Sequence, residues 1–306
     1  MFLMNFNEEQ AKELIDLIDR DYALFNTLPP SHRKIIAAAV RTNRIYAERC
    51  WAVFVMFSVM TFPAMAVVQN VYSYSFAAEP VRHMVHDVPI PFAEPEARLR
   101  SPQFELFFAY MTYCATLYVV NFTGYDGFFG LCINHACLKM ALYCRAMEDA
   151  MCSREDQLGG RVRSVIEGQC DLFRFVKLVQ GVFNTWLGII LVATMIQICT
   201  CMYHITEGYE FDMRYLVFVI ATVVHIYLPC RYSSKLKNMS TETATLLYCC
   251  GWEGVPEERM RRVLLFMIAR AQQPTEIIAF NIFVFDMELF VSILQTSYSM
   301  YTLLRS

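Results

Sequence analysis

Small polar side chains recur at three- and four-residue spacing within an apolar run near the C-terminus, Leu289–Leu304. Such spacing puts them on one stripe covering about a third of a helix circumference. Hydroxyls on one face of a membrane helix can bond to neighbouring helices, or they can line an aqueous ion path when several copies of the helix surround an axis. Spacing alone leaves both interpretations open. The residues are Ser292, Gln295, Thr296, Ser299 and Thr302.

A second set of side chains gathers toward one end of three other apolar runs. Flexible methionines and flat aromatic rings with a few polar groups suit a small apolar or amphipathic molecule. The same residue types are common at ordinary contacts between helices, so this choice also stays open. The candidate ligand-binding residues are Phe62, Met65, Gln69, Tyr72, Tyr110, Met111, Tyr113, Cys114, Phe218 and Thr222.

The elements that must position these residues are membrane helices. Hydrophobic residues make up 56% of the chain, charged residues 18%, and the mean hydropathy is +0.34. A soluble chain needs less apolar surface, whereas a chain whose outer face meets lipid requires it. The sequence therefore predicts an all-α, polytopic membrane helix bundle with five crossings. These are Trp51–Phe76, Leu106–Tyr125, Leu178–Tyr203, Tyr215–Cys230 and Leu289–Leu304.

The basic residues predict how the helices are oriented in the membrane. Of the 26 Lys and Arg residues, 21 lie in alternate connections between the runs. Because cytoplasmic connections carry the excess of basic residues, the N-terminus is expected in the cytoplasm and the C-terminus outside the cell. The last two runs would be about 24 Å long as helices, slightly short for a ~30 Å hydrocarbon core. They have weaker support than the other three.

Three regions follow from this layout. Residues 1–50 are expected to form a cytoplasmic amphipathic segment, and residues 51–230 a ligand-sensing transmembrane bundle with a Pro-rich extracellular loop at 77–105. Residues 231–306 are expected to hold a cytoplasmic anchor region and the pore-lining last helix. Helical character continues beyond the membrane past Asp126 and around residues 260–277, which favours a cytoplasmic assembly domain.

Charged residues near the ends of the runs have simpler interpretations. Asp286 and Glu288 are expected at the cytoplasmic interface or beside an ion path, because lone carboxylates are costly in lipid. Asp126 and Lys139 are interpreted as boundary residues, and His135 and His225 as isolated.

The sequence gives no indication of an enzyme. It contains no HExxH motif, phosphate loop, nucleophile elbow or paired zinc-ligand pattern, so neither a metal nor a cofactor is predicted. The net charge of −3 does not point to a nucleic-acid partner. The expected surroundings are membrane lipid.

The last third of the chain resembles the C-terminal signature of the insect odorant receptors, a family of ligand-gated ion channels. The related gustatory receptors end differently. The residues that carry the resemblance, in order, are Tyr248, Trp252, Arg262, Leu265, Arg270, Gln272, Pro274, Phe283, Phe285, Ser297, Tyr298, Thr302 and Leu303.

The resemblance implies seven helices with a cytoplasmic N-terminus, of which the five runs match helices three to seven. The first two helices are then expected to be absent from this chain. It further implies an odorant-gated, non-selective cation channel in the plasma membrane of olfactory sensory neurons, built as a heterotetramer with the family's co-receptor and opened by a small volatile odorant. An alternative is a truncated, non-conducting subunit or a gustatory-type receptor that only associates with full-length receptors. The implied pore residues are Ser292, Gln295, Ser299, Thr302 and Leu303.

Overall fold

The computed structural model describes residues 8–77, 79–86, 99–207 and 213–305. Residues 87–98, which belong to the predicted Pro-rich loop at 77–105, lie outside that range. Long helices make up nearly all of the described chain, which confirms the all-α prediction. In chain order they are α2 (Glu8–Phe25), α3 (Pro30–Thr42), the π-helical η1 (Asn43–Cys50), α4 (Trp51–Phe76), α5 (Gln103–Met151), α6 (Glu155–Glu207), α7 (Met213–Tyr248), the 3₁₀-helical η3 (Trp252–Gly254), α8 (Glu258–Ala271) and α9 (Met287–Arg305).

Four of the five predicted crossings lie in helices that are long and apolar enough to span a membrane, as judged over the described residues. They fall in the continuous helix of α3 to α4, and in α5, α6 and α7. The fifth predicted crossing forms α9, a helix of 19 residues at the expected place. The helix α9 is not among the four helices that are apolar enough to span a membrane, because its hydroxyls and Gln295 lower its mean hydropathy.

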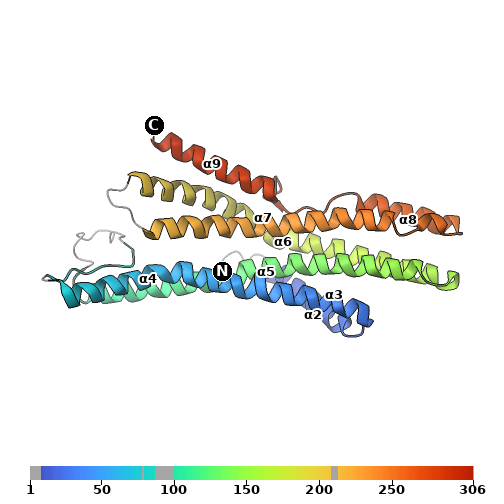
Figure 1. Cartoon of the computed structure of the whole chain (residues 1–306), viewed down its shortest axis with the longest axis horizontal. Helices are drawn as coiled ribbons and strands as arrows, with labels where there is room; N and C mark the ends of the chain where they lie inside the picture. Colours follow the sequence, from blue (N-terminus) through green and yellow to red (C-terminus); the bar gives the residue numbers. More distant parts are fainter. Residues whose placement is uncertain (1–7, 78, 87–98, 208–212, 306) are drawn as a thin grey trace.

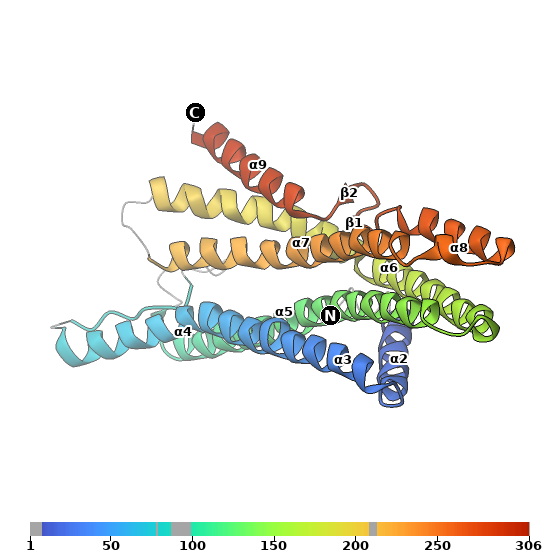
Figure 2. The same cartoon turned by 45° about the vertical axis from the view of Figure 1, so that its right-hand side comes forward.

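The helices run roughly along one long axis (Figures 1 and 2). The chain passes along α4, returns along α5, and repeats this with α6 and α7. Toward one end lie the C-terminal ends of α4 and α9, and at the other lie α8 and the turn between α5 and α6. With 49 residues, α5 is about 70 Å long, more than twice the thickness of a hydrocarbon core. The predicted continuation of this helix past Asp126 is therefore confirmed.

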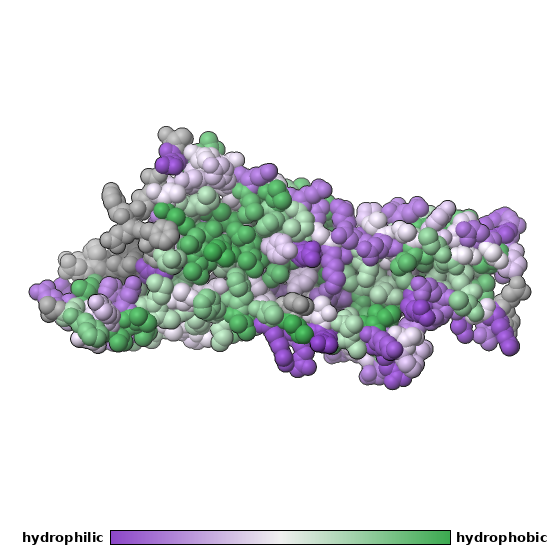
Figure 3. All heavy atoms as spheres, in the orientation of Figure 1, coloured by the Kyte–Doolittle hydropathy of each residue, from purple (hydrophilic) through white to green (hydrophobic). Residues whose placement is uncertain are grey.

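The surface divides along the same axis. Figure 3 shows apolar side chains concentrated over the half that contains α4 and α9, and polar side chains more frequent over the half that contains α8. An apolar outer surface is stable against lipid but not against water. We therefore place the first half in the membrane and the second half outside it.

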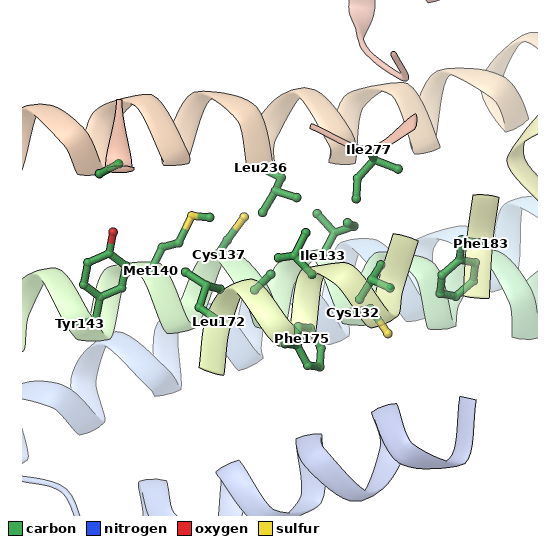
Figure 4. Close-up of a cluster of buried hydrophobic side chains, with 14 of the residues drawn as sticks. Cys132, Ile133, Cys137, Met140, Tyr143, Leu172, Phe175, Phe183, Leu236 and Ile277 are labelled. Atoms are coloured by element: carbon green, nitrogen blue, oxygen red, sulfur yellow. The ribbon is translucent and has the colours of Figure 1, made fainter. Parts of the chain in front are cut away.

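The main core lies in the second half, where α5, α6 and α7 pack together. Its side chains are fully or almost fully buried, which is the close packing typical of a protein interior. Figure 4 shows members of this core pointing toward one another from all three helices and from the segment before β1: Ile133, Cys137, Met140, Leu172, Leu236 and Ile277.

The segment between α8 and α9 differs from the prediction. Helical character was expected through residue 277, but α8 ends at Ala271, shortly before the helix breaker Pro274. A small antiparallel hairpin follows, made of β1 (Ile278–Ala279) and β2 (Phe283–Val284). Two of its three turn residues, Phe280 and Asn281, have φ angles of 50° and 58°.

The hairpin is fixed to α6 by hydrogen bonds. The side chain of Gln180 bonds to both backbone groups of Ile278, accepting from its N–H at 2.8 Å. One turn further, the Asn184 side chain accepts from the Asn281 N–H at 3.0 Å. These contacts satisfy backbone groups that remain unpaired in a hairpin whose strands are only two residues long. They hold the start of α9 at a defined place on α6.

Candidate functional site

The predicted ligand-binding residues are partly brought together between α4, α5 and α7. Phe62 and Phe218 form an edge-to-face pair with ring centroids 5.7 Å apart. Phe62 is buried with Ala66, and Met111 packs against the same cluster from α5. The edge-to-face geometry is an energetically favourable arrangement of two aromatic rings. The cluster is therefore an apolar contact shared by α4, α5 and α7, three of the described helices that are long and apolar enough to span a membrane.

A small cavity of about 40 Å³ lies next to this cluster, among α4, α5, α6 and α7. Its walls combine aromatic rings with a few polar groups, as in sites for small amphipathic molecules. The hydroxyls of Ser58 and Thr222 donate to carbonyls of their own helices, each at 2.8 Å, so their oxygens can still accept a hydrogen bond. The lining residues are Trp51, Phe54, Val55, Ser58, Val59, Tyr118, Phe122, Gln197, Phe218, Ala221, Thr222 and His225.

One lining residue of this cavity, His225, is paired with a buried carboxylate on α5. Nε2 of His225 is 3.3 Å from Oδ2 of Asp126, and both side chains are largely buried. The imidazole also stacks on the ring of Trp51, with an interplanar angle of 9°. The interpretations of Asp126 as a boundary residue and of His225 as isolated were therefore wrong. The two lie 99 positions apart, and only the packing of α5 against α7 brings them together.

Other predicted ligand-binding residues do not join the cavity. Tyr72, Tyr110 and Tyr113 are 65%, 62% and 61% exposed, and Cys114 is exposed as well. On α5 the residues at 110, 113 and 114 share one helical face. That face points away from α4 and α7, whereas Met111 points inward. Met65 and Gln69 are half-buried on α4.

The predicted pore residues all lie on one exposed side of α9. Ser292, Gln295, Ser299, Thr302 and Leu303 are exposed, as is Thr296. The opposite side of the helix, with Ile293, Ser297 and Tyr301, is buried against the bundle. Tyr301 donates a 3.1 Å hydrogen bond to the Thr206 hydroxyl of α6. The small polar residues of α9, apart from Ser297, thus point away from the chain's own helices.

The start of α9 is capped and tied to α7. The Asp286 carboxylate accepts from the backbone N–H groups of Glu288 and Leu289 at 3.1 and 3.0 Å, and its other oxygen lies 3.3 Å from the Lys237 ammonium. A carboxylate at a helix N-terminus satisfies unpaired donors and favours the helix dipole. Ser234 accepts from the Met287 N–H at 2.9 Å. Asp286 is therefore a helix cap with an α7 partner.

A further polar cluster, missed by the sequence analysis, joins α2 to α5. Asp21 Oδ2 accepts from Lys139 Nζ at 2.6 Å and lies 3.0 Å from His135 Nε2. His135 and Lys139 were interpreted as isolated and as a boundary residue, and both interpretations were wrong. Their four-residue spacing puts them on one face of α5, which was the available signal.

These features define a class: a multi-pass helical membrane receptor with a small cavity among its spanning helices and a terminal helix whose polar side is turned outward. Residues 1–298 match the family model of the 7tm odorant receptors, and the chain belongs to that family.

Named relatives and solved structures agree with the family. Odorant receptor 13a of Drosophila melanogaster is 22% identical over 99% of this chain and 75% of its own length. Odorant receptor 2a of the same fly is 31% identical over 29% of this chain and 22% of its own length. The insect olfactory receptor OR5 of Machilis hrabei has the same fold, with a TM-score of 0.70 at 13% identity, covering 99% of this chain and 76% of OR5. Its structure in complex with eugenol gives a TM-score of 0.69 at 12% identity, covering 89% of this chain and 69% of OR5. Receptors of this family are not enzymes.

Proposed function

We propose that the chain is a subunit of an odorant-gated, non-selective cation channel that works with a co-receptor in the plasma membrane of olfactory neurons. The observation that carries the proposal is the outward polar side of α9, where Ser292, Gln295, Ser299 and Thr302 are exposed in the single chain. Hydroxyl and amide groups exposed to lipid are costly, but around a shared aqueous axis they are solvated.

The proposed odorant site is the cavity next to the Phe62 and Phe218 rings. A small amphipathic molecule fits its chemistry, since the apolar walls bury carbon and the oxygens of Ser58 and Thr222 can accept a hydrogen bond. The OR5 structure in complex with eugenol supports a ligand of this size class. Because the cavity holds only about 40 Å³, the odorant must displace side chains when it binds. We propose that Phe218, which lines the cavity, is one of the side chains displaced.

The proposed link between cavity and pore is α7. This helix carries Phe218 and Thr222 at the cavity, and further along it Ser234 and Lys237, which hold the start of α9. An odorant opens the pore only if it binds the open arrangement more tightly than the closed one. A rotation or shift of α7 on odorant binding would move both sets of residues together.

Under this proposal residues 51–230 sense the ligand, and residues 231–306 form the anchor and pore. The N-terminus is cytoplasmic, and the C-terminus is extracellular.

The test is expression of this chain with a co-receptor and measurement of odorant-evoked currents, with the co-receptor alone as control. Phe218→Ala is expected to shift the odorant concentration that gives half-maximal current by about tenfold, since a lost ring contact costs on the order of 1.4 kcal/mol or more. Tyr113→Ala, on the outer face of α5, is the matched control. Surface-expressed chain that adds no odorant response to the co-receptor contradicts the proposal.

A further inference from the structure

A groove of about 840 Å³ lies between the start of α4 and the middle of α7, and it shares only Trp51 and Phe54 with the lining of the odorant cavity. We propose that this groove binds the headgroup and the first part of an acyl chain of an anionic phospholipid. The inference does not depend on channel activity. It rests on how the residues that line the groove are ordered along the membrane axis.

The part of the groove toward the membrane half is apolar and aromatic. Trp51 and Phe54 form one wall at the start of α4, and Val224, Tyr227 and Leu228 form the other on α7. Aromatic rings are favoured at the boundary between hydrocarbon and headgroups. This part of the groove suits the glycerol backbone and the first methylenes of a lipid.

The part toward the polar half carries the positive charge. Arg231 directly follows the apolar run of α7, and Lys235 lies one turn further on the same face. Four residues of separation put both side chains on one side of the helix. Glu242, the one acidic residue lining the groove among those described, lies about two turns beyond Lys235. The basic pair is therefore next to the apolar walls and the carboxylate is remote from them.

Arg231 has no hydrogen bond or ion pair to any residue in the described part of the chain, and its side chain is exposed. Five donors in a planar fork match the oxygens of a phosphate. Because Arg231 directly follows the apolar run Tyr215–Cys230, it lies at the end of the hydrocarbon-facing segment, the depth at which lipid phosphates lie.

Lys235 is held in place by amides. Its Nζ donates to Oδ1 of Asn134 at 2.6 Å, and Nδ2 of Asn134 donates to Oδ1 of the buried Asn43 at 2.8 Å. The chain of bonds continues from Asn43 to Glu48 at 3.3 Å. One Lys235 proton is used in this way, and two remain to donate. A preorganised ammonium loses less side-chain freedom when it binds an anion.

The order of groups from apolar wall to basic pair is the order of groups in a phospholipid, from acyl chain to phosphate. A zwitterionic headgroup carries its own cation and gains less from a basic pair. A serine or inositol phospholipid has net negative charge and gains more, by about fivefold in affinity for each basic side chain near the surface. An anionic lipid therefore fits the groove better than phosphatidylcholine.

The experiment uses the unmodified chain in nanodiscs that contain equal amounts of phosphatidylserine and phosphatidylcholine. Native mass spectrometry then counts the lipids that stay bound. We expect phosphatidylserine to be retained about 25-fold over phosphatidylcholine, Arg231→Gln to lower that ratio about fivefold, and Arg231→Gln with Lys235→Gln to bring it close to one. Lys177→Gln is the matched control, since Lys177 is exposed and also directly borders an apolar run, on α6. Equal retention of the two lipids, or an equal loss of preference in the Lys177 variant, overturns the proposal.

A second measurement locates the lipid without relying on the charge variants. Trp51 fluorescence, in a Trp186→Phe, Trp252→Phe background, is expected to be quenched more strongly by dibrominated phosphatidylserine than by dibrominated phosphatidylcholine. Soluble glycerophosphoserine should not relieve the quenching, because it lacks the acyl chains that the aromatic walls hold. Relief by the soluble headgroup overturns the lipid assignment in favour of a free phosphate compound. Absence of quenching by either lipid means that protein, such as a second copy of the chain, covers the groove, and also overturns it.

Discussion

The ammonium of Lys139 donates a 2.6 Å hydrogen bond to the carboxylate of Asp21, which lies 118 residues earlier in the chain. The same oxygen of Asp21 is 3.0 Å from Nε2 of the buried His135. Lys139 also lies 5.9 Å from the ring of Phe175 on α6. This one carboxylate therefore joins the N-terminal helix α2 to the part of α5 that continues beyond the membrane.

Asp21→Asn is expected to destabilise the attachment of α2 by about 3 kcal/mol, because it leaves a largely buried ammonium without its anion. The measurement is thermal unfolding in detergent, together with the rate of proteolysis within α2. Asp19→Asn, on the exposed side of the same helix, is the matched control and should change little. Equal effects of the two substitutions would mean that the Asp21 pair does not hold α2.

The same pair predicts a dependence on pH. Burial raises the pKa of Asp21, but the hydrogen bonds from His135 and Lys139 outweigh that effect and hold the pKa below its ordinary value of 3.8. A lowered carboxylate pKa contributes stability that is fully present above the unfolded pKa and is lost as the pH falls through the folded pKa. Amide exchange of α2 should therefore stay slow from neutral pH down to about 4, and accelerate below that. The acceleration should be absent in Asp21→Asn and retained in Asp19→Asn.

Gly188 of α6 lies directly under the ring of Phe280 at the tip of the hairpin. A Cβ at position 188 would overlap that ring, whereas at Gly168, on the same helix, it would meet nothing within 4 Å. The Phe280 backbone has a φ of 50°, a conformation that costs a bulky residue energy, so the contact must help to hold it.

Gly188→Ala is therefore expected to destabilise the chain by about 1–3 kcal/mol through overpacking, despite the better helix propensity of alanine. Gly168→Ala should stabilise it by about 0.5–1 kcal/mol. Thermal unfolding in detergent compares the two. A stabilised Gly188→Ala protein would show that the hairpin does not need this contact. It would also contradict the role proposed for the contact in positioning the start of α9.

Cysteine substitution can map the polar side of α9. Cysteines at Ser292, Gln295, Ser299 and Thr302 should react with a charged thiol reagent on the order of ten times faster than one at Ser297, because reactivity follows exposure and thiolate formation. The parent chain, with its own free cysteines, gives the background. Reaction at the exposed sites should also reduce odorant-evoked current. Equal rates at Ser299 and Ser297 would contradict a water-filled path along this side.

Several features of this protein could be predicted from the sequence because their physical cause is local. Long uncharged runs must be buried in lipid or in a core, so α4 to α7 were predicted close to their positions in the structure. The stripe of hydroxyls on α9 follows from helical periodicity within one element, which needs no knowledge of its neighbours. The C-terminal signature led to the correct family for the same reason, since it is an ordered string of residues. The roles of the pore and ligand residues remain predictions.

The tertiary structure alone decided which residues meet. Asp21 and Lys139, and likewise Asp126 and His225, lie about a hundred positions apart, and their pairing depends on how two helices are rotated about their axes. The same rotation turns Met111 into the bundle and Tyr110 and Tyr113 out of it, although all three lie within one turn. Composition cannot fix that rotation, because it results from the summed packing of many side chains against several neighbours. The short hairpin before α9 likewise depends on distant residues, because Gln180 and Asn184 of α6 bond to its backbone.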